Sequence, residues 1–276
     1  MKNLNLKVVM SFLGLGLVFV SCNKDEATEI TDSQAIAPEV IEKVKSLALN
    51  PDGMTIQNVE RPDGSMETTY LLEGDIAISA EQLDGMSIYD GITSEQYRTR
   101  NLVSQPRTLS VIGYTGGANA LTTNMRTGLS WAINNYNALG LTLRFNLSFR
   151  TSTAADIVVY RQPNVSGAGG QAGFPTSGNP FKWVQIYRGL DNANANVNEH
   201  VATHEIGHCL GMRHTDYFSR QSCGQNVNEG DGGVGAIHIP GTPTGYDSTS
   251  IMLACFNFNT NGEFNGNDRT ALRFLY

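Results

Sequence analysis

The sequence has little charge and no hydrophobic run long enough to cross a bilayer. Charged residues make up 16% of its 276 residues and hydrophobic residues 40%. This composition excludes an intrinsically disordered chain, because such chains combine high charge with few apolar residues. The length allows one sizeable core and a smaller accessory region. The apolar run at residues 8–20 is too short for a spanning helix.

Basic residues are scarce and are not clustered. The net charge is −7, and residues 23–106 carry 16 acidic and 6 basic side chains, whereas residues 107–276 carry 10 acidic and 11 basic ones. The acidity therefore belongs to the N-terminal part. No segment forms the basic patch that nucleic-acid binding requires, so we expect no nucleic-acid partner. The sequence contains no internal repeats.

Cysteine is also scarce, with four in the chain, and the first of them follows an export signal. A basic start, the apolar run at residues 8–20 and then Cys22 have the layout of such a signal. Residues 19–22 resemble the lipobox of bacterial lipoproteins. The resemblance implies a signal peptide at 1–21, a lipidated Cys22 and attachment to a membrane through that lipid. We expect an outer-membrane lipoprotein of the cell envelope, and residues 24–26 favour the cell surface.

Three further cysteines remain if Cys22 carries a lipid, and an exported protein can oxidise two of them. Cys209 directly follows a candidate metal ligand, His208, and is interpreted as a small buried side chain. A disulfide between Cys223 and Cys255 is therefore the expected pairing.

The periodicity of residues 107–276 predicts a compact α+β domain. Apolar residues recur at helical spacing from 121 to 136, and strict alternation follows over 141–149. These patterns predict a helix and a half-buried strand. Further strands are expected at 157–160 and 183–187, with an edge segment at 167–173, which gives a sheet of mixed direction.

The N-terminal part is expected to have local order but little core. Residues 23 to about 45 are polar and predict a solvated tether. A strand at 68–72, a turn at 73–75 and a short helix after a capping box of Ser79 and Gln82 are predicted beyond it.

The chemistry is concentrated in a helix predicted to begin near residues 194–198 and to end at Gly211. His204 and His208 lie one turn apart, so both imidazoles can reach one ion, with Glu205 beside them. Gly211 permits a sharp turn that brings His214 back as a third ligand. Three protein ligands leave one zinc position open, which is the coordination of catalytic zinc sites, and Glu205 is the expected general base.

The remaining histidines are not expected to bind the metal. His200, one turn earlier on the same helix face, would close the site as a fourth ligand, so it is interpreted as a partly exposed flank. His238 lies in a distant loop. Whether the loops at 226–235 and 259–268 bind calcium stays open, with ordinary turns as the simpler interpretation.

The full pattern His-Glu-x-x-His-x-x-Gly-x-x-His resembles that of the metzincin clan of metalloproteases. The similarity extends to residues 250–253, which look like the clan's methionine turn around Met252, to an edge strand near 171–175 and to a closing helix at 267–276. It implies a metzincin-like fold with a mixed, mainly parallel twisted sheet, two long helices, a zinc site and a C-terminal helix. Substrate is expected to add as an extended strand beside residues 168–174.

The core His-Glu-Ile-Gly-His further resembles the bacterial dual-action HEIGH metallopeptidases. The chain departs from astacins, another group of the clan, because Thr215 stands where they have glutamate and no tyrosine closely follows Met252. The resemblance implies a zinc-dependent endopeptidase, expected as a monomer, that acts on proteins or peptides. A thermolysin-like peptidase and a lipid-anchored binding or adhesion module with an inactive metal site are the alternatives.

Residues 22–106 are expected to form an acidic tether and a removable pro-segment before a peptidase domain at 107–276. No cysteine lies between residues 23 and 200, which excludes a thiolate latency switch. Residues 72–76 resemble the astacin pro-segment motif in which an aspartate caps the metal, and here that residue is Asp75. A plain turn and a purely steric pro-segment are the alternatives, and Arg98, Arg100 or Arg107 marks the expected cleavage.

Overall fold

The structure, a computed structural model, describes residues 35–47, 49–86, 97–229 and 236–276. These residues belong to one compact unit, Gln34–Tyr276. The expected signal peptide and the expected lipidation site, Cys22, lie outside the described residues. No helix within the described ranges is long and apolar enough to cross a membrane.

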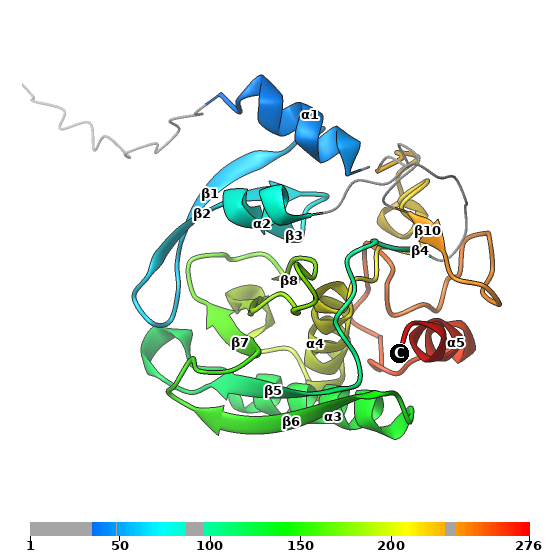
Figure 1. The fold of residues 1–276 in the computed structure, drawn as a ribbon. Helices are drawn as coiled ribbons and strands as arrows, with labels where there is room; N and C mark the ends of the chain where they lie inside the picture. The colour runs from blue at the N-terminus through cyan, green and yellow to red at the C-terminus, as the bar shows by residue number, and fades with distance from the viewer. Residues whose placement is uncertain (1–34, 48, 87–96, 230–235) are drawn as a thin grey trace, which may run out of the picture. The chain divides into compact units, whose positions relative to one another are not determined.

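A five-stranded sheet forms the centre of the fold (Figure 1). Its strands lie in the order β6 (Leu143–Arg150), β5 (Arg107–Tyr114), β7 (Ile157–Gln162), β9 (Trp183–Tyr187) and β8 (Gly170–Gln171). The first four strands run parallel, and β8 pairs antiparallel with β9 at the edge. The predicted mixed, mainly parallel sheet is thus confirmed. β5 occupies a stretch where the sequence predicts only a domain boundary.

Two long helices cover one face of this sheet. Alternate residues of β5, β7 and β9 share one core with α3 (Thr123–Ala138) and α4 (Ala195–Cys209). The two helices cross closely at Gly128, where a Cβ would lie 2.4 Å from the backbone nitrogen of Glu199. Any larger residue would push the helices apart, so this glycine helps to fix α4 against the core.

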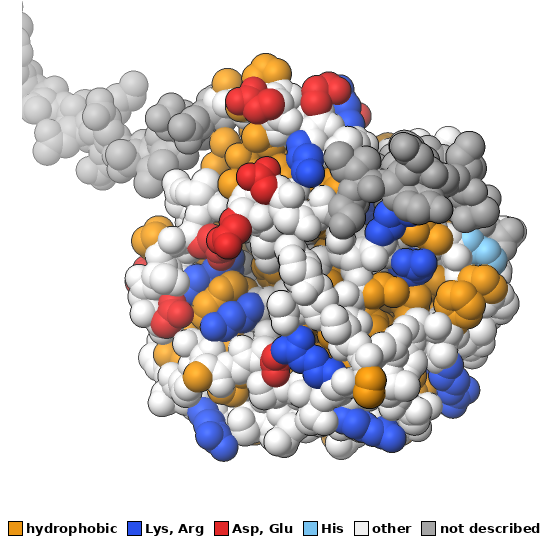
Figure 2. Space-filling view, in the orientation of Figure 1, with side chains coloured by type: hydrophobic (Ala, Val, Ile, Leu, Met, Phe, Trp, Pro, Cys, Tyr) orange, Lys and Arg blue, Asp and Glu red, His pale blue; other side chains and the backbone are white. Residues whose placement is uncertain are grey.

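Residues 35–47 and 49–86 form what we call the N-terminal layer. It contains α1 (Pro38–Ser46), an antiparallel sheet of β1 (Thr55–Glu60), β2 (Met66–Leu72) and β3 (Ile76–Ser79), and α2 (Ala80–Gly85). Ten buried residues, nine of them from this layer, make a second apolar core. The expectation of a solvated tether is therefore wrong for residues 38–46, and the expectation of little core is wrong for the layer. Figure 2 shows acidic side chains gathered over this layer.

The N-terminal layer joins the edge of the central sheet. Ala77 N donates to Ala172 O at 2.6 Å, and Ala172 N donates to Asp75 O at 3.0 Å. These bonds surround a parallel bridge between Ile76 and Ala172, next to β8. The layer thereby occupies backbone groups at the edge along which substrate is expected to bind.

The described residues also form a short two-stranded sheet, three short helices and a C-terminal helix. β4 (Tyr97–Arg98) pairs antiparallel with β10 (Ile237–His238), and short 3-10 helices lie at Gly117–Asn119, Arg188–Leu190 and Gln221–Cys223. The C-terminal helix α5 (Gly266–Leu275) begins with a capping box of Asn265 and Asp268. The Tyr276 hydroxyl donates to Leu210 O, which ties the C-terminus to the end of α4.

Candidate metal centre

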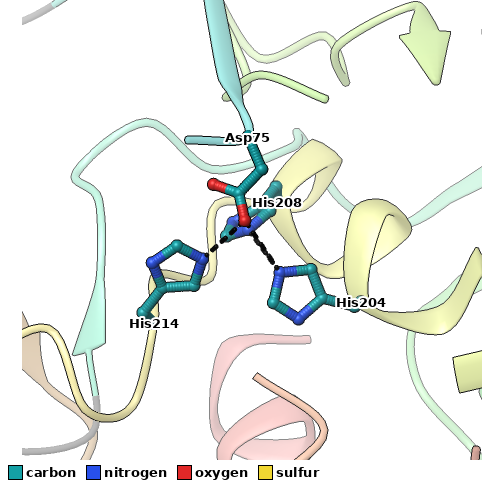
Figure 3. A group of neighbouring side chains, drawn as sticks. All are labelled: Asp75, His204, His208 and His214. Atoms are coloured by element: carbon teal, nitrogen blue, oxygen red, sulfur yellow. Dashed lines mark hydrogen bonds and ion pairs between the residues drawn. The ribbon is translucent and has the colours of Figure 1, made fainter. Parts of the chain in front are cut away.

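Helix α4 and the turn after it bring the three predicted histidines together (Figure 3). The Asn194 side chain caps the helix by accepting from Val197 N at 3.0 Å. The chain leaves the helix at Gly211, which has φ +97°, and a Cβ there would lie 2.5 Å from Asn101 O. Only glycine adopts this conformation without strain in the space available. The turn directs His214 back toward His204 and His208.

Each histidine uses its Nδ1 to bind an acceptor that lies away from the centre. His204 Nδ1 donates to Ile251 O at 2.9 Å, and His208 Nδ1 donates to Met212 O at 2.8 Å. His214 Nδ1 lies 3.0 Å from both carboxylate oxygens of Glu229. A carbonyl only accepts, so His204 and His208 carry a ring proton on Nδ1 and direct Nε2 inward. His214 also directs Nε2 inward, and although burial opposes it, the Asp75 and Glu229 carboxylates at its two ring nitrogens raise the pKa of His214 well above its ordinary value.

The inward atoms form a compact group of four donors to a metal. His208 Nε2 lies 2.9 Å from His204 Nε2, and Asp75 Oδ2 lies 3.0 Å from His214 Nε2 and 3.6 Å from His204 Nε2. All four ligand atoms lie within 4.8 Å of one another. Burial lowers the pKa of His208 well below its ordinary value, with the charges of the other two histidines adding to the effect, so this ring is neutral.

This arrangement fits a metal ion. Two Nε2 lone pairs that face each other across 2.9 Å repel unless a cation lies between them. Histidine ligands in metal sites almost always donate their other ring N–H to a carbonyl or carboxylate, as all three do here. Imidazole nitrogens with a carboxylate oxygen are a donor set that suits zinc.

Glu205 lies at the boundary between α4 and the edge strand β8. A Cβ on Gly170 would lie 2.7 Å from Glu205 Oε1 and 2.8 Å from its Cγ, so β8 leaves room for the carboxylate only because residue 170 is glycine. Glu205 Oε2 is buried and has no hydrogen-bond partner among the described residues. Burial raises the pKa of Glu205 well above its ordinary value, and the Asp75 carboxylate raises it further.

The predicted methionine turn packs against α4, the helix that carries His204 and His208. Met252 is fully buried, and a Cβ on Gly207 of α4 would lie 2.5 Å from its Sδ. The turn is held from behind, because Asp268 of α5 accepts from Ser250 Oγ at 2.7 Å and from Ile251 N at 3.0 Å. The same turn presents Ile251 O to His204. Its packing therefore orients one of the three histidines.

Asp75 reaches the centre from a hairpin tip of the N-terminal layer. Glu73 and Gly74 have φ +54° and +95°, and Asp75 N donates to Leu72 O at 3.2 Å. Two successive positive φ angles are typical of the tight turns that join antiparallel strands, and glycine adopts them readily. The turn places the carboxylate of Asp75 beside the imidazoles (Figure 3).

A second acidic residue of the same tip is bound by arginines. Glu73 Oε1 accepts from Arg213 Nη2 at 2.7 Å, and the two side chains are 2% and 0% exposed. Arg220 Nη1 donates to Glu73 O at 2.9 Å and also binds Glu229. The tip, the third histidine and its carboxylate partner therefore belong to one network. The sequence does not predict Glu73, Arg213, Arg220 or Glu229, because no local pattern marks them.

The other residues named from the sequence lie around the centre. Cys223 and Cys255 are joined by a disulfide, and Cys209 is a buried thiol. His238 is not part of the metal-ligand group. His200 is only 6% exposed, so the expectation of a partly exposed flank is wrong. Its ring is packed between neighbours that include Phe256.

A cavity of about 300 Å³ adjoins the histidines. It is lined by His204 and Glu205 of α4, by the N-terminal tip at residues 73–75, and by Val201, Leu253 and Phe256. A buried carboxylate beside converging imidazoles, with an adjoining cavity, is the kind of site in which ligands and substrates bind.

Comparisons with known proteins agree with this chemistry. The model of the dual-action HEIGH metallo-peptidase family matches residues 70–276, which include Glu205 and the three histidines. Two solved structures of myroilysin are similar. One is 16% identical and covers 73% of this chain and 98% of its own, with a TM-score of 0.41. The other is 18% identical and covers 64% and 95%, with a TM-score of 0.41. No curated protein matches the chain. The family model spans well over half of the sequence, and the chain therefore belongs to the dual-action HEIGH metallopeptidases.

Proposed function

We propose that this metallopeptidase is a zinc-dependent endopeptidase in which His204, His208 and His214 hold the metal and Glu205 is the general base. The observation that carries the proposal is the orientation of the imidazoles, whose Nδ1 atoms are all engaged so that the Nε2 atoms converge. Bound zinc would supply Lewis acidity and lower the pKa of water at the site.

The chain's own residues would perform the proton transfers and position the substrate. Glu205 would take a proton from the attacking water and return it to the leaving amine. Its carboxylate is buried beside the imidazoles, and a positioned carboxylate can make both transfers. Backbone groups beside β8, including those of Ala172, would bind an extended substrate once the N-terminal layer has left them.

Glu205→Gln tests the base. Parent and variant both carry Asp75→Ala, which removes the candidate ligand contributed by the N-terminal layer. We expect the variant to bind zinc as its parent does and to lose peptidase activity by about 10²-fold or more through loss of proton transfer. Zinc content is measured by elemental analysis and activity with casein and a fluorogenic peptide. Glu263→Gln, an exposed change elsewhere, is the control. Turnover near that of the Asp75→Ala parent by the zinc-loaded variant would exclude Glu205 as the base.

We also propose that the enzyme is made as a latent zymogen whose N-terminal layer is removed by cleavage near Arg98, Arg100 or Arg107. Asp75 would be the fourth ligand in the latent form, and its oxygen would take the position that the attacking water needs. Two observations support this proposal: Asp75 Oδ2 lies 3.0 Å from His214 Nε2, and the layer is hydrogen-bonded to the edge at Ala172.

The test of latency compares intact chains. Asp75→Ala should raise the activity of the intact chain above that of the intact wild type, since the carboxylate no longer competes with water. Mass spectrometry before and after the assay verifies that neither chain has been cut, and Asp84→Ala, an exposed change in α2, is the control. If the two intact chains are equally inactive, capping of the metal by Asp75 is excluded. An intact wild type as active as the processed enzyme would exclude the zymogen altogether.

The alternative is a lipid-anchored binding or adhesion module with an inactive metal site. Glu205 weighs against it, because a purely structural zinc site needs no base. Zinc content and peptide cleavage distinguish the two proposals, because such a module would bind zinc but would cleave no peptide in either the intact or the processed form.

A further inference from the structure

His200 is a buried histidine beside the metal centre that the proposed mechanism does not use. It stands one turn before His204 on α4, and the two rings are nearly parallel, with 21° between their planes and 6.5 Å between their centroids. Phe256 packs against it at 5.2 Å. Its Nδ1 lies 2.8 Å from Thr260 Oγ1, which holds the ring in one orientation.

The second nitrogen of this ring has no partner. His200 Nε2 is buried and forms no hydrogen bond with any described residue, although the side chain is only 6% exposed. It is not one of the four atoms that converge on the metal position. A buried polar atom without a partner is costly, and such atoms often mark a place where a ligand completes the hydrogen bonds.

His200 lies in the wall between two cavities. The cavity of about 300 Å³ beside the metal and a neighbouring one of about 490 Å³ share His200, Leu253, Cys255 and Phe256. The first is lined by residues of the metal centre and also by the apolar Val201, Phe256 and Phe258. The second is lined mainly by neutral polar residues, among them Ser248, Asn257 and Thr260.

We propose that His200 is a specificity-determining residue that selects tyrosine beside the scissile bond. The inference rests on the proposed peptidase function. Phe256 packs beside His200 and Phe258, with ring centroids 5.2 and 6.0 Å away, and an aromatic substrate side chain would find aromatic partners there. A phenolic hydroxyl both donates and accepts, so it can bind His200 Nε2 whichever way the Thr260 hydroxyl points. Phenylalanine would fill the same space and leave the nitrogen unpaired.

The experiment uses the full chain carrying Asp75→Ala and two peptides that differ only by tyrosine or phenylalanine next to the cleaved bond. A site that hydrogen-bonds a substrate hydroxyl discriminates strongly against the analogue that lacks it, so we expect kcat/KM to favour tyrosine by at least about tenfold. His200→Phe should abolish this preference, and His200→Gln, which keeps a hydrogen-bonding group, should retain part of it. A third peptide with leucine at that position should be cut at similar rates by all three chains, which shows that the variants fold and bind metal.

Three results would overturn the inference: equal kcat/KM for tyrosine and phenylalanine in the parent chain, an unchanged preference in His200→Phe, or loss of leucine-peptide cleavage together with loss of zinc in both variants. If the parent chain cuts none of the peptides, the proposed function fails. The pocket is then judged by binding of the tyrosine and phenylalanine peptides to the same chains, where equal Kd values refute it and a tyrosine preference that His200→Phe removes supports it.

Discussion

Replacing Glu73 with glutamine should weaken the docking of the hairpin tip without touching a metal ligand. Glu73 Oε1 lies 2.7 Å from Arg213 Nη2, and both side chains are almost completely buried. The Arg220 guanidinium binds the backbone oxygen of Glu73, so that contact survives the substitution. The change therefore removes one charge from a buried pair and leaves the turn itself intact.

The size of the effect follows from the burial of the pair. Removing one partner of a buried ion pair costs about 3–5 kcal/mol, and the amide of glutamine can still accept one hydrogen bond, so we take the lower end. Since about 1.4 kcal/mol is a factor of ten, the undocked fraction of the hairpin should rise about a hundredfold. Asp75 would leave the metal in that fraction of the molecules. The peptidase activity of the intact chain should therefore rise in proportion to the undocked fraction.

The assay is the initial rate of fluorogenic-peptide cleavage per mole of intact chain. We expect Glu73→Gln to lie between the silent wild type and Asp75→Ala. Glu81→Gln is the matched control, because Glu81 is an exposed glutamate of the same layer. If Glu73→Gln is as silent as the wild type under conditions in which Asp75→Ala is active, the buried pair does not contribute to latency.

Three further results are expected. In Gly207→Ala a Cβ would lie 2.5 Å from Met252 Sδ, so overpacking should lower the free energy of unfolding by about 1–3 kcal/mol. The measurement is the Tm, which should fall in Gly207→Ala and partly recover in the double variant Gly207→Ala/Met252→Ala. Burial and, to a smaller extent, the charge of Glu263 raise the pKa of Glu199 to about 7. Because the folded pKa exceeds the unfolded one, the free energy of unfolding should fall as pH rises toward 7, and Glu199→Gln should flatten that slope in thermal melts. Cys22→Ala should remove labelling by a fatty-acid probe and release the protein from membranes, and undiminished labelling would contradict lipidation.

The local parts of the fold are predictable because their patterns are local. The alternation that predicts a strand over 141–149 corresponds to β6 (Leu143–Arg150), and the asparagines near 194 cap α4 as expected. The three histidines and Glu205 lie within a span of eleven residues, so one helix and one glycine turn are sufficient to bring them together.

Elements that depend on distant partners are not predictable in this way. β5 is buried between β6 and β7, but its sequence mixes apolar residues with Arg107, Thr108 and Ser110, so no clear period appears. The apolar residues of the N-terminal layer are spread over α1, β2 and β3, each too short to show a pattern by itself. Their common core exists only after the strands pair.

The partners of the site are hidden for the same reason. Glu229 lies 15 residues beyond His214, in a stretch of asparagines and glycines that suggests only turns, yet its carboxylate holds the ring. Gly170 lies on β8, whereas Glu205 lies on α4, so no local sequence pattern connects them. The role of this glycine is visible only in the structure, where a Cβ at residue 170 would lie 2.7 Å from Glu205 Oε1.

The structure also bears on how activation could proceed. His214 is held on its Nδ1 side by Glu229, and His204 and His208 are held by Ile251 O and Met212 O. All of these acceptors lie outside the N-terminal layer, whereas Asp75 contacts the imidazoles only from the Nε2 side. Departure of the layer would remove one candidate ligand and leave every group that orients the other three. Latency of this kind blocks a site that is already assembled, so activation would require release of the hairpin and no rearrangement of the histidines.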